Sequence, residues 1–153
     1  MMTLCSEVLK TLRGKSLVTA ESLTGGGIGA ALTSVSGASE VYKGGVISYT
    51  NEAKHELLGV SLQTLKVHGA VSVQTAEEMA IGARKLLKAD IAVSVTGLAG
   101  PGGDEYGNPV GTVCVGYCDA GKSFAVRYHF EGDREAVRNQ TIRAALELVL
   151  NNQ

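Results

Sequence analysis

The sequence predicts a three-layer α/β/α domain with a mixed sheet that includes a C-terminal β-hairpin. Strand and helix patterns alternate along the N-terminal part of the chain, which favours parallel strands joined by helices. Farther along, two strand patterns flank residues 119–122, Asp-Ala-Gly-Lys, and this is a hairpin signal. A chain of 153 residues has the size of one domain, so we expect residues 1–153 to fold as a single unit.

Apolar residues recur at helical or strand spacing in the first part of the chain, and glycines mark the boundaries. Gly14 follows the first helical pattern and Gly59 the third, as C-caps do. Four glycines among residues 25–29 fall in the second helix, where each costs about 1 kcal/mol relative to Ala. The expected elements are helices at 3–13, 24–35 and 51–58 and strands at 15–20 and 42–49.

The clearest helical pattern begins at residues 75–78, Thr-Ala-Glu-Glu, which fit a capping box, and it extends to about Lys88. Residues 91–95 form a run suited to a strand that is covered on both faces. Residues 96–108 are rich in Gly and Pro, and loops of that length are usually functional or disordered. The remaining expected elements are strands at 110–118 and 123–130 and a final helix capped by Asp133.

Charge and hydropathy exclude several classes of partner. Lys and Arg number 14 against 15 Asp and Glu, so the chain offers no electrostatic footprint for nucleic acid or for an acidic membrane surface. No run of 18 apolar residues occurs, and the N-terminus lacks a basic region followed by an apolar one. We therefore expect a cytoplasmic protein that binds neither nucleic acid nor membrane.

Cysteine and histidine usage predicts neither a disulfide framework nor a metal site. The three cysteines are odd in number and sparse, and the three histidines are scattered singly. We expect no metal and no cofactor.

The glycine-rich stretch after the first strand admits several interpretations. Gly25-x-Gly27-x-x-Ala30 has the spacing of a dinucleotide fingerprint, but the acidic residue expected about 20 positions later is missing. A P-loop is excluded more firmly, because no Gly-Lys-Ser/Thr follows. Two possibilities remain open: backbone N–H groups that approach an anion at a helix N-terminus, or glycines that let the helix pack closely on the sheet.

Ser22 ends a predicted strand just before a helix whose first N–H groups carry partial positive charge. Such a serine can attack a carbonyl whose oxyanion needs donors, although it can also be a plain N-cap. A serine nucleophile needs a base, and Lys54 is the better candidate because no His lies at a comparable strand end. The first turn of helix 51–58 and burial would both favour a neutral amine, whereas the alternative is a solvated surface lysine. Tyr49, at the end of the second strand, can relay or orient the proton.

Further candidate ligand-binding residues follow other strand ends, because ligands in open α/β sheets bind beyond the carboxyl ends of strands. The loop after the third expected strand supplies some of them, although a flexible surface loop is the alternative. Arg134 and Arg138 lie one turn apart on the last helix and can clamp a phosphate or carboxylate, or form a solvated face. The full expected binding set is Thr24, Gly25, Gly26, Asn51, Thr96, Gly97, Gly100, Arg134 and Arg138.

Five motifs, in order, resemble the C-terminal domain of the competence/damage-inducible protein CinA, over about residues 4–148. They are Thr-Ala-Glu-Ser-Leu-Thr-Gly-Gly at 19–26, Tyr-Thr-Asn-Glu-Ala-Lys at 49–54, Gly-Ala-Val-Ser at 69–72, Val-Thr-Gly-Leu-Ala-Gly-Pro at 95–101 and Gly-Asp-Arg-Glu-Ala-Val-Arg at 132–138. That family includes stand-alone nicotinamide mononucleotide deamidases.

The resemblance implies a metal-free amidohydrolase that converts nicotinamide mononucleotide to nicotinate mononucleotide and ammonia, in pyridine nucleotide salvage. The family's Ser-Tyr-Lys site maps onto Ser22, Tyr49 and Lys54, with the Thr of its glycine-rich loop at Thr96. Leu23 stands where the family often has Cys, so we expect no chemistry there. Larger CinA proteins carry an N-terminal domain whose activity is not carried over.

Two alternatives stay open at the level of sequence. One is a non-catalytic nucleotide-binding or regulatory domain, for which a nucleophile and base would be unnecessary. The other is a Ser/Lys amidase for another small amide. The many small residues are also compatible with a homo-oligomer.

Overall fold

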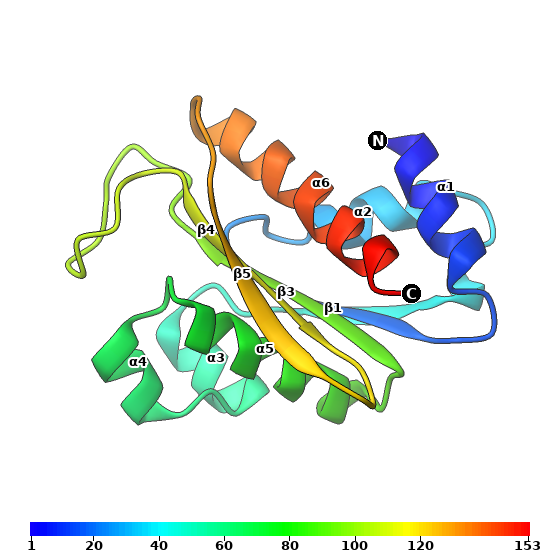
Figure 1. Cartoon of the computed structure of the whole chain (residues 1–153), viewed down its shortest axis with the longest axis horizontal. Helices are drawn as coiled ribbons and strands as arrows, with labels where there is room; N and C mark the ends of the chain where they lie inside the picture. Colours follow the sequence, from blue (N-terminus) through cyan, green and yellow to red (C-terminus); the bar gives the residue numbers. More distant parts are fainter.

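The computed structural model describes residues 1–153 and contains a five-stranded mixed sheet between two layers of helices (Figure 1). The strand order is β2-β1-β3-β4-β5. Strand β1 pairs in parallel with β2 and with β3. Strand β4 pairs antiparallel with β3 and with β5, and β4 and β5 form a hairpin at the end of the sheet. The predicted fold class is therefore confirmed. The strands are β1 (Leu17–Glu21), β2 (Tyr42–Ile47), β3 (Ile91–Gly97), β4 (Thr112–Cys118) and β5 (Ser123–His129).

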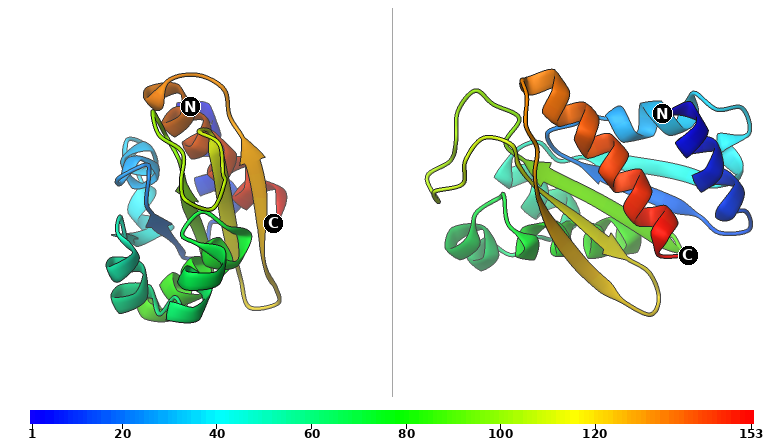
Figure 2. Two further views of the ribbon diagram at one scale, coloured as in Figure 1. Left: turned by 90° about the vertical axis from the view of Figure 1, so that its left-hand side faces the viewer. Right: turned by 45° about the horizontal axis from the view of Figure 1, so that its top comes forward.

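A layer of helices lies on each side of the sheet (Figure 2). On one face lie α1 (Met2–Thr11), α2 (Gly27–Thr33) and α6 (Arg134–Asn151), and on the other α3 (Asn51–Leu58), α4 (Leu62–His68) and α5 (Val73–Leu87). A single 3-10 turn, Ala38–Glu40, leads into β2. Strands β1 and β4 are buried along their whole length because helices cover both of their faces.

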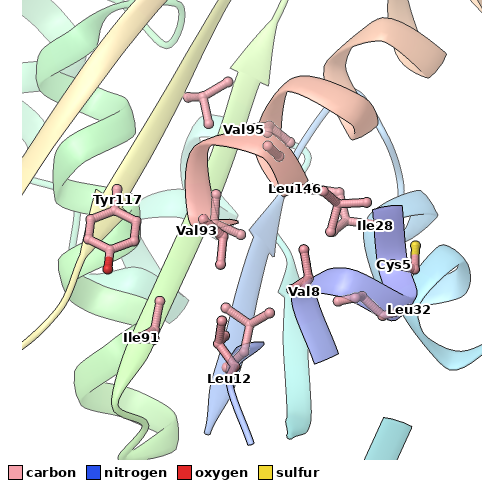
Figure 3. Packing of buried hydrophobic residues seen from close by; sticks show 14 of the residues in the cluster. Cys5, Val8, Leu12, Ile28, Leu32, Ile91, Val93, Val95, Tyr117 and Leu146 are labelled. Atoms are coloured by element: carbon pink, nitrogen blue, oxygen red, sulfur yellow. The ribbon is translucent and has the colours of Figure 1, made fainter. Parts of the chain in front are cut away.

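Each face has its own hydrophobic core. The larger cluster joins α1, α2 and α6 to the sheet, and Figure 3 shows Val8, Ile28 and Leu146 from these helices gathered over Val93 of β3. The smaller cluster lies under α5 and includes Met79. These two cores hold the sheet between the helical layers.

Three details differ from the sequence-based expectation. Helix α2 begins at Gly27, not at residue 24, because Gly25 and Gly26 have positive φ values of 59° and 102° and form a turn. The capping box at Thr75 was wrong. Ser72 caps α5 by accepting a hydrogen bond from the Thr75 N–H, and the helix begins at Val73. Helix α4 was not anticipated.

The register of the parallel strands places three loop starts at one edge of the sheet. Glu21 of β1 lies beside Ile47 of β2 and Val95 of β3. The residues that follow these strand ends therefore meet at the same edge, at the left of Figure 1.

Helix α3 packs closely against α5 at Gly82, a residue of α5. A Cβ atom added to Gly82 would collide with the backbone of Leu58, the last residue of α3. The absence of a side chain at residue 82 thus sets how closely α3 approaches, and α3 carries Lys54.

We expect Gly82→Ala to destabilise the protein, although Ala favours a helix over Gly by about 1 kcal/mol. The collision with the Leu58 backbone should outweigh that preference and give a net loss of about 1–2 kcal/mol in the free energy of unfolding, measured in urea. Gly121→Ala, at the β4–β5 turn, meets only ordinary contact and is the control. A Gly82→Ala protein as stable as the wild type would contradict this packing.

Candidate functional site

The turn between β1 and α2, residues 22–26, presents Ser22 at the sheet edge. Its only internal backbone hydrogen bond runs from the Gly25 N–H to the Ser22 carbonyl, at 3.1 Å. The backbone N–H groups of Leu23 and Thr24 make no hydrogen bond within the chain. The turn therefore leaves free donors next to the Ser22 hydroxyl.

Helix α3 places Lys54 against that hydroxyl. The Thr50 side chain caps the helix by accepting from the Ala53 N–H, which puts Lys54 at the end of the first turn. The Lys54 Nζ donates to Ser22 Oγ at 3.0 Å and to the carbonyls of Ser48 at 2.9 Å and Tyr49 at 3.4 Å. All three acceptors are uncharged, and no carboxylate lies within ion-pair distance.

Burial without a counter-ion changes the acidity of this amine. Lys54 is only 2% exposed. Desolvation penalises the charged form and lowers the pKa of Lys54 from 10.5 to about 8. The group can thus exchange a proton close to neutral pH, whereas an exposed lysine stays charged.

A cavity of about 280 Å³ opens beside the pair. Ser22 and Lys54 line it together with residues from the loops that follow β2 and β3 and from the start of α6. Eight of the residues expected from sequence line it: Ser22, Tyr49, Asn51, Lys54, Thr96, Gly97, Gly100 and Arg134.

Tyr49 and Arg134 face each other across the mouth of the cavity. Arg134 donates to the Tyr49 hydroxyl at 3.2 Å and to the Gly100 carbonyl at 2.8 Å. Tyr49 is 59% exposed, and its hydroxyl makes no hydrogen bond with Ser22 or Lys54. Tyr49 thus contacts Lys54 through its backbone carbonyl, whereas its hydroxyl does not contact the serine–lysine pair.

The loop between β3 and β4 forms one wall and is tied down by its own side chains. The Asp104 carboxylate accepts from the Tyr106 and Asn108 N–H groups and from the Asn108 side chain. Asn108 in turn accepts from Arg127 of β5, and the Tyr106 hydroxyl donates to the Leu65 carbonyl of α4. The loop is therefore anchored to β5 through Asn108 and to α4 through Tyr106.

Four of the expected binding residues lie outside the cavity lining: Thr24, Gly25, Gly26 and Arg138. The Thr24 hydroxyl donates to Glu21, and Arg138 donates to the carbonyls of Leu23 at 2.9 Å and Thr24 at 3.1 Å. Arg138 therefore holds the backbone of the turn and does not face the cavity with Arg134.

The open question of the glycine-rich stretch is answered by Glu21. Its carboxylate accepts from the Ile28 and Gly29 N–H groups of α2 at 2.9 and 3.1 Å. The N–H groups at the start of α2 are thus occupied by a carboxylate of the protein itself and are not free for an external anion. The glycines also pack closely, because a Cβ on Gly27 would press on Ile142 and one on Gly29 on Tyr42.

Sequence reasoning missed six residues of the cavity lining, namely Leu23, Ala70, Val71, Leu98, Ala99 and Gly102, and it also missed Ser48 and Glu21. Ser48 contributes a backbone carbonyl, which carries no signal in the side-chain pattern. Glu21 did leave a signal, namely an acidic residue at the end of a buried strand and three positions before a threonine. No group of three His, Cys, Asp or Glu side chains is arranged to hold a metal ion, and no helix is long and apolar enough to cross a membrane.

Comparison with known proteins places the chain in a family. The model of the CinA C-terminal domain matches residues 2–152, so the chain belongs to the CinA C-terminal domain family, as the sequence motifs predicted. Among solved structures, a CinA superfamily protein from Escherichia coli superimposes with a TM-score of 0.97 at 36% identity, over 99% of this chain and 90% of that one.

Curated relatives fall into two lengths. The nicotinamide-nucleotide amidohydrolase PncC of Escherichia coli K12 is 44% identical over 96% of this chain and 91% of its own. A CinA-like protein of Thermotoga maritima is 46% identical over 88% of this chain, but the match spans only 33% of that longer relative. The chain thus corresponds to nearly the whole of the short relatives and about a third of the long ones.

The buried lysine makes a pH-dependent contribution to stability. Its folded-state pKa of about 8 lies below the unfolded value of 10.5. Between these pH values the unfolded chain carries the proton and the folded chain does not, so stability rises with pH. Relative to Lys54→Met, we expect the wild-type free energy of unfolding to rise by on the order of 3 kcal/mol across this window.

Urea unfolding at a series of pH values measures this difference. Lys66→Met removes an exposed lysine of α4 and should give a flat difference from wild type. A flat difference for Lys54→Met as well would show that Lys54 stays charged in the folded protein.

Proposed function

We propose that this protein hydrolyses the carboxamide of nicotinamide mononucleotide to give nicotinate mononucleotide and ammonia, with Ser22 as nucleophile and Lys54 as base. The substrate is suggested by the relative named nicotinamide-nucleotide amidohydrolase, which this chain matches over nearly its whole length. The chemistry is suggested by the Ser22–Lys54 hydrogen bond of 3.0 Å at the wall of the cavity.

The single observation that carries the proposal is the set of acceptors around Lys54. An ammonium has three N–H donors, and three acceptors surround it: Ser22 Oγ and the carbonyls of Ser48 and Tyr49. When the amine is neutral, its two N–H groups can remain on the two carbonyls. Its lone pair then faces the Ser22 hydroxyl, in position to accept that proton.

The reaction would follow in two halves. The Ser22 proton passes to Lys54 Nζ while Oγ bonds to the carboxamide carbon, whose oxygen becomes an oxyanion. Lys54 then protonates the nitrogen, the C–N bond breaks, ammonia leaves, and an acyl-serine remains. In the second half, Lys54 takes a proton from water, the hydroxide attacks the acyl carbon, and Ser22 recovers its proton as the acid is released.

Free backbone donors suit the developing oxyanion. The N–H groups of Leu23, which lines the cavity, and of Thr24, which lies just outside the lining, have no partner within the chain and follow Ser22 directly. Two N–H donors beside a nucleophile are a common way to stabilise a tetrahedral intermediate. We assign the oxyanion to this turn.

Arg134 is the better candidate for the substrate phosphate. It lies at the cavity mouth and donates only to neutral acceptors, the Tyr49 hydroxyl and the Gly100 carbonyl. A phosphate would replace these with charge-assisted bonds, which are stronger. We assign Tyr49 an orienting role beside Arg134 rather than a proton relay, because its hydroxyl bonds to Arg134 and not to the pair.

We expect Ser22→Ala and Lys54→Met each to lower kcat for ammonia release from nicotinamide mononucleotide by at least about 100-fold. The controls Ser36→Ala and Lys66→Met change exposed residues and should leave kcat unaltered. Wild-type kcat/KM should rise with pH through about 8, as Lys54 loses its proton.

Several outcomes would count against this assignment. Retention of activity in either variant would remove the proposed roles, and binding of the nucleotide without ammonia release by the wild type would favour a non-catalytic nucleotide-binding domain. Faster release from nicotinamide or its riboside than from the mononucleotide would favour an amidase for another small amide.

We expect Arg134→Ala to raise KM for nicotinamide mononucleotide by about 10- to 100-fold, the value of a hydrogen bond to a charged group. The KM for nicotinamide riboside, which has no phosphate, should stay within about 2-fold. Arg143→Ala, elsewhere on α6 and paired with Glu147, is the control. An equal loss with both substrates would place the phosphate elsewhere.

A further inference from the structure

The residue that precedes the proposed nucleophile in the chain carries a buried carboxylate, and the reaction above makes no use of it. Glu21 is only 2% exposed. One of its oxygens accepts from the Thr24 hydroxyl at 2.5 Å and the Ile28 N–H at 2.9 Å, and the other accepts from the Gly29 N–H at 3.1 Å. A buried charge is costly unless it is well bonded, so three donors are committed to this group.

We propose that Glu21 is a positioning residue for the reaction at Ser22, which fixes the conformation of the 22–26 turn and thereby the direction of its free N–H groups. This inference rests on the proposed function. It adds a role for a side chain that touches neither the cavity nor the reacting atoms.

Backbone hydrogen bonds restrain the two glycines of the turn at only a few points. Gly25 and Gly26 both have positive φ, and glycine loses more conformational freedom on ordering than other residues. One backbone hydrogen bond, from the Gly25 N–H to the Ser22 carbonyl, lies within the turn, and another, from the Gly27 N–H to the Thr24 carbonyl, joins the turn to α2. Glu21 accepts from the Thr24 hydroxyl, which precedes the two glycines, and from the Ile28 N–H of α2, which follows them. The carboxylate thus fixes the residues on both sides of the glycine pair.

Arg138 completes the restraint from the other side of the turn. It holds the carbonyl of Leu23 at 2.9 Å. In a planar trans peptide the C=O and the following N–H point in opposite directions, so this contact aims the Thr24 N–H away from Arg138. The Thr24 side chain is held by Glu21 at the same time. Both the peptide and the side chain at this position are thus fixed.

Glu21 does not act as a charge partner of Lys54. The three hydrogen bonds of Lys54 Nζ go to Ser22, Ser48 and Tyr49, and none goes to Glu21. Burial is the one cause that lowers the pKa of Lys54. Positioning and charge therefore predict different results, because only a charge partner would alter the pH dependence of the reaction.

The test is Glu21→Gln, which keeps the shape but presents an amide to the N–H groups of α2. We expect kcat for ammonia release to fall by at least about 10-fold, because small displacements of a reacting group are costly. The KM should change by less than about 3-fold, and the midpoint of the pH profile should stay within about 0.3 of the wild-type value.

Glu78→Gln is the matched control. The Glu78 carboxylate also accepts from one backbone N–H, that of Ser61, and from one threonine hydroxyl, that of Thr64, and it lies outside the cavity lining. It should lose stability without losing kcat. An equal fall of kcat in both variants, or a shifted pH midpoint in Glu21→Gln alone, would overturn the positioning role.

A second pair of variants tests the same contact if Glu21→Gln does not fold. Thr24→Val removes only the hydroxyl that donates to Glu21, and Thr24→Ser keeps it. We expect kcat to fall about 5-fold or more in Thr24→Val and to fall clearly less in Thr24→Ser, which restores the hydroxyl. Equal kcat in the two would contradict the inference.

The proposed function is judged separately in the same series. If the wild type releases ammonia and Ser22→Ala does not, the function stands and the Glu21 variants decide the inference. If the wild type releases none, the function fails before Glu21 is considered.

Discussion

The site depends on a lysine that is buried without a carboxylate partner. An exposed lysine keeps its proton at neutral pH, and a salt-bridged one keeps it still more firmly. Lys54 is held instead by a hydroxyl and two backbone carbonyls. Two features of the fold create this environment: the parallel strand ends bring Ser22 and Ser48 to one edge, and the close contact of α3 with α5 at Gly82 positions the helix that carries the amine.

Much of this arrangement could be predicted because it depends on short-range patterns. Parallel strands end at the same edge, so Ser22, Tyr49 and Thr96 were expected near one another from their positions after strands. The capping of α6 by Asp133 was also confirmed. The Asp133 cap follows from local sequence, and the meeting of the three loop starts follows from the parallel pairing of β2, β1 and β3.

The remaining features depend on which of several partners a side chain finds in three dimensions. The start of α5 offers two overlapping serine or threonine caps. Glu78 does not complete the second one, because its carboxylate is bound to Ser61 and Thr64 of the neighbouring helix. Likewise, Arg134 and Arg138 share a spacing that suggests one common ligand. In the structure, Arg134 bonds to the Gly100 carbonyl at the cavity, whereas Arg138, one turn farther along α6, bonds to the Leu23 carbonyl of the turn.

The anchored loop between β3 and β4 has a consequence for molecular recognition. Flexible segments that fold around a ligand spend part of the binding free energy on their own ordering. Here the Asp104 and Tyr106 contacts already meet that cost in the folded chain. An incoming molecule would therefore encounter a preformed wall, and its affinity would reflect complementarity more than induced closure.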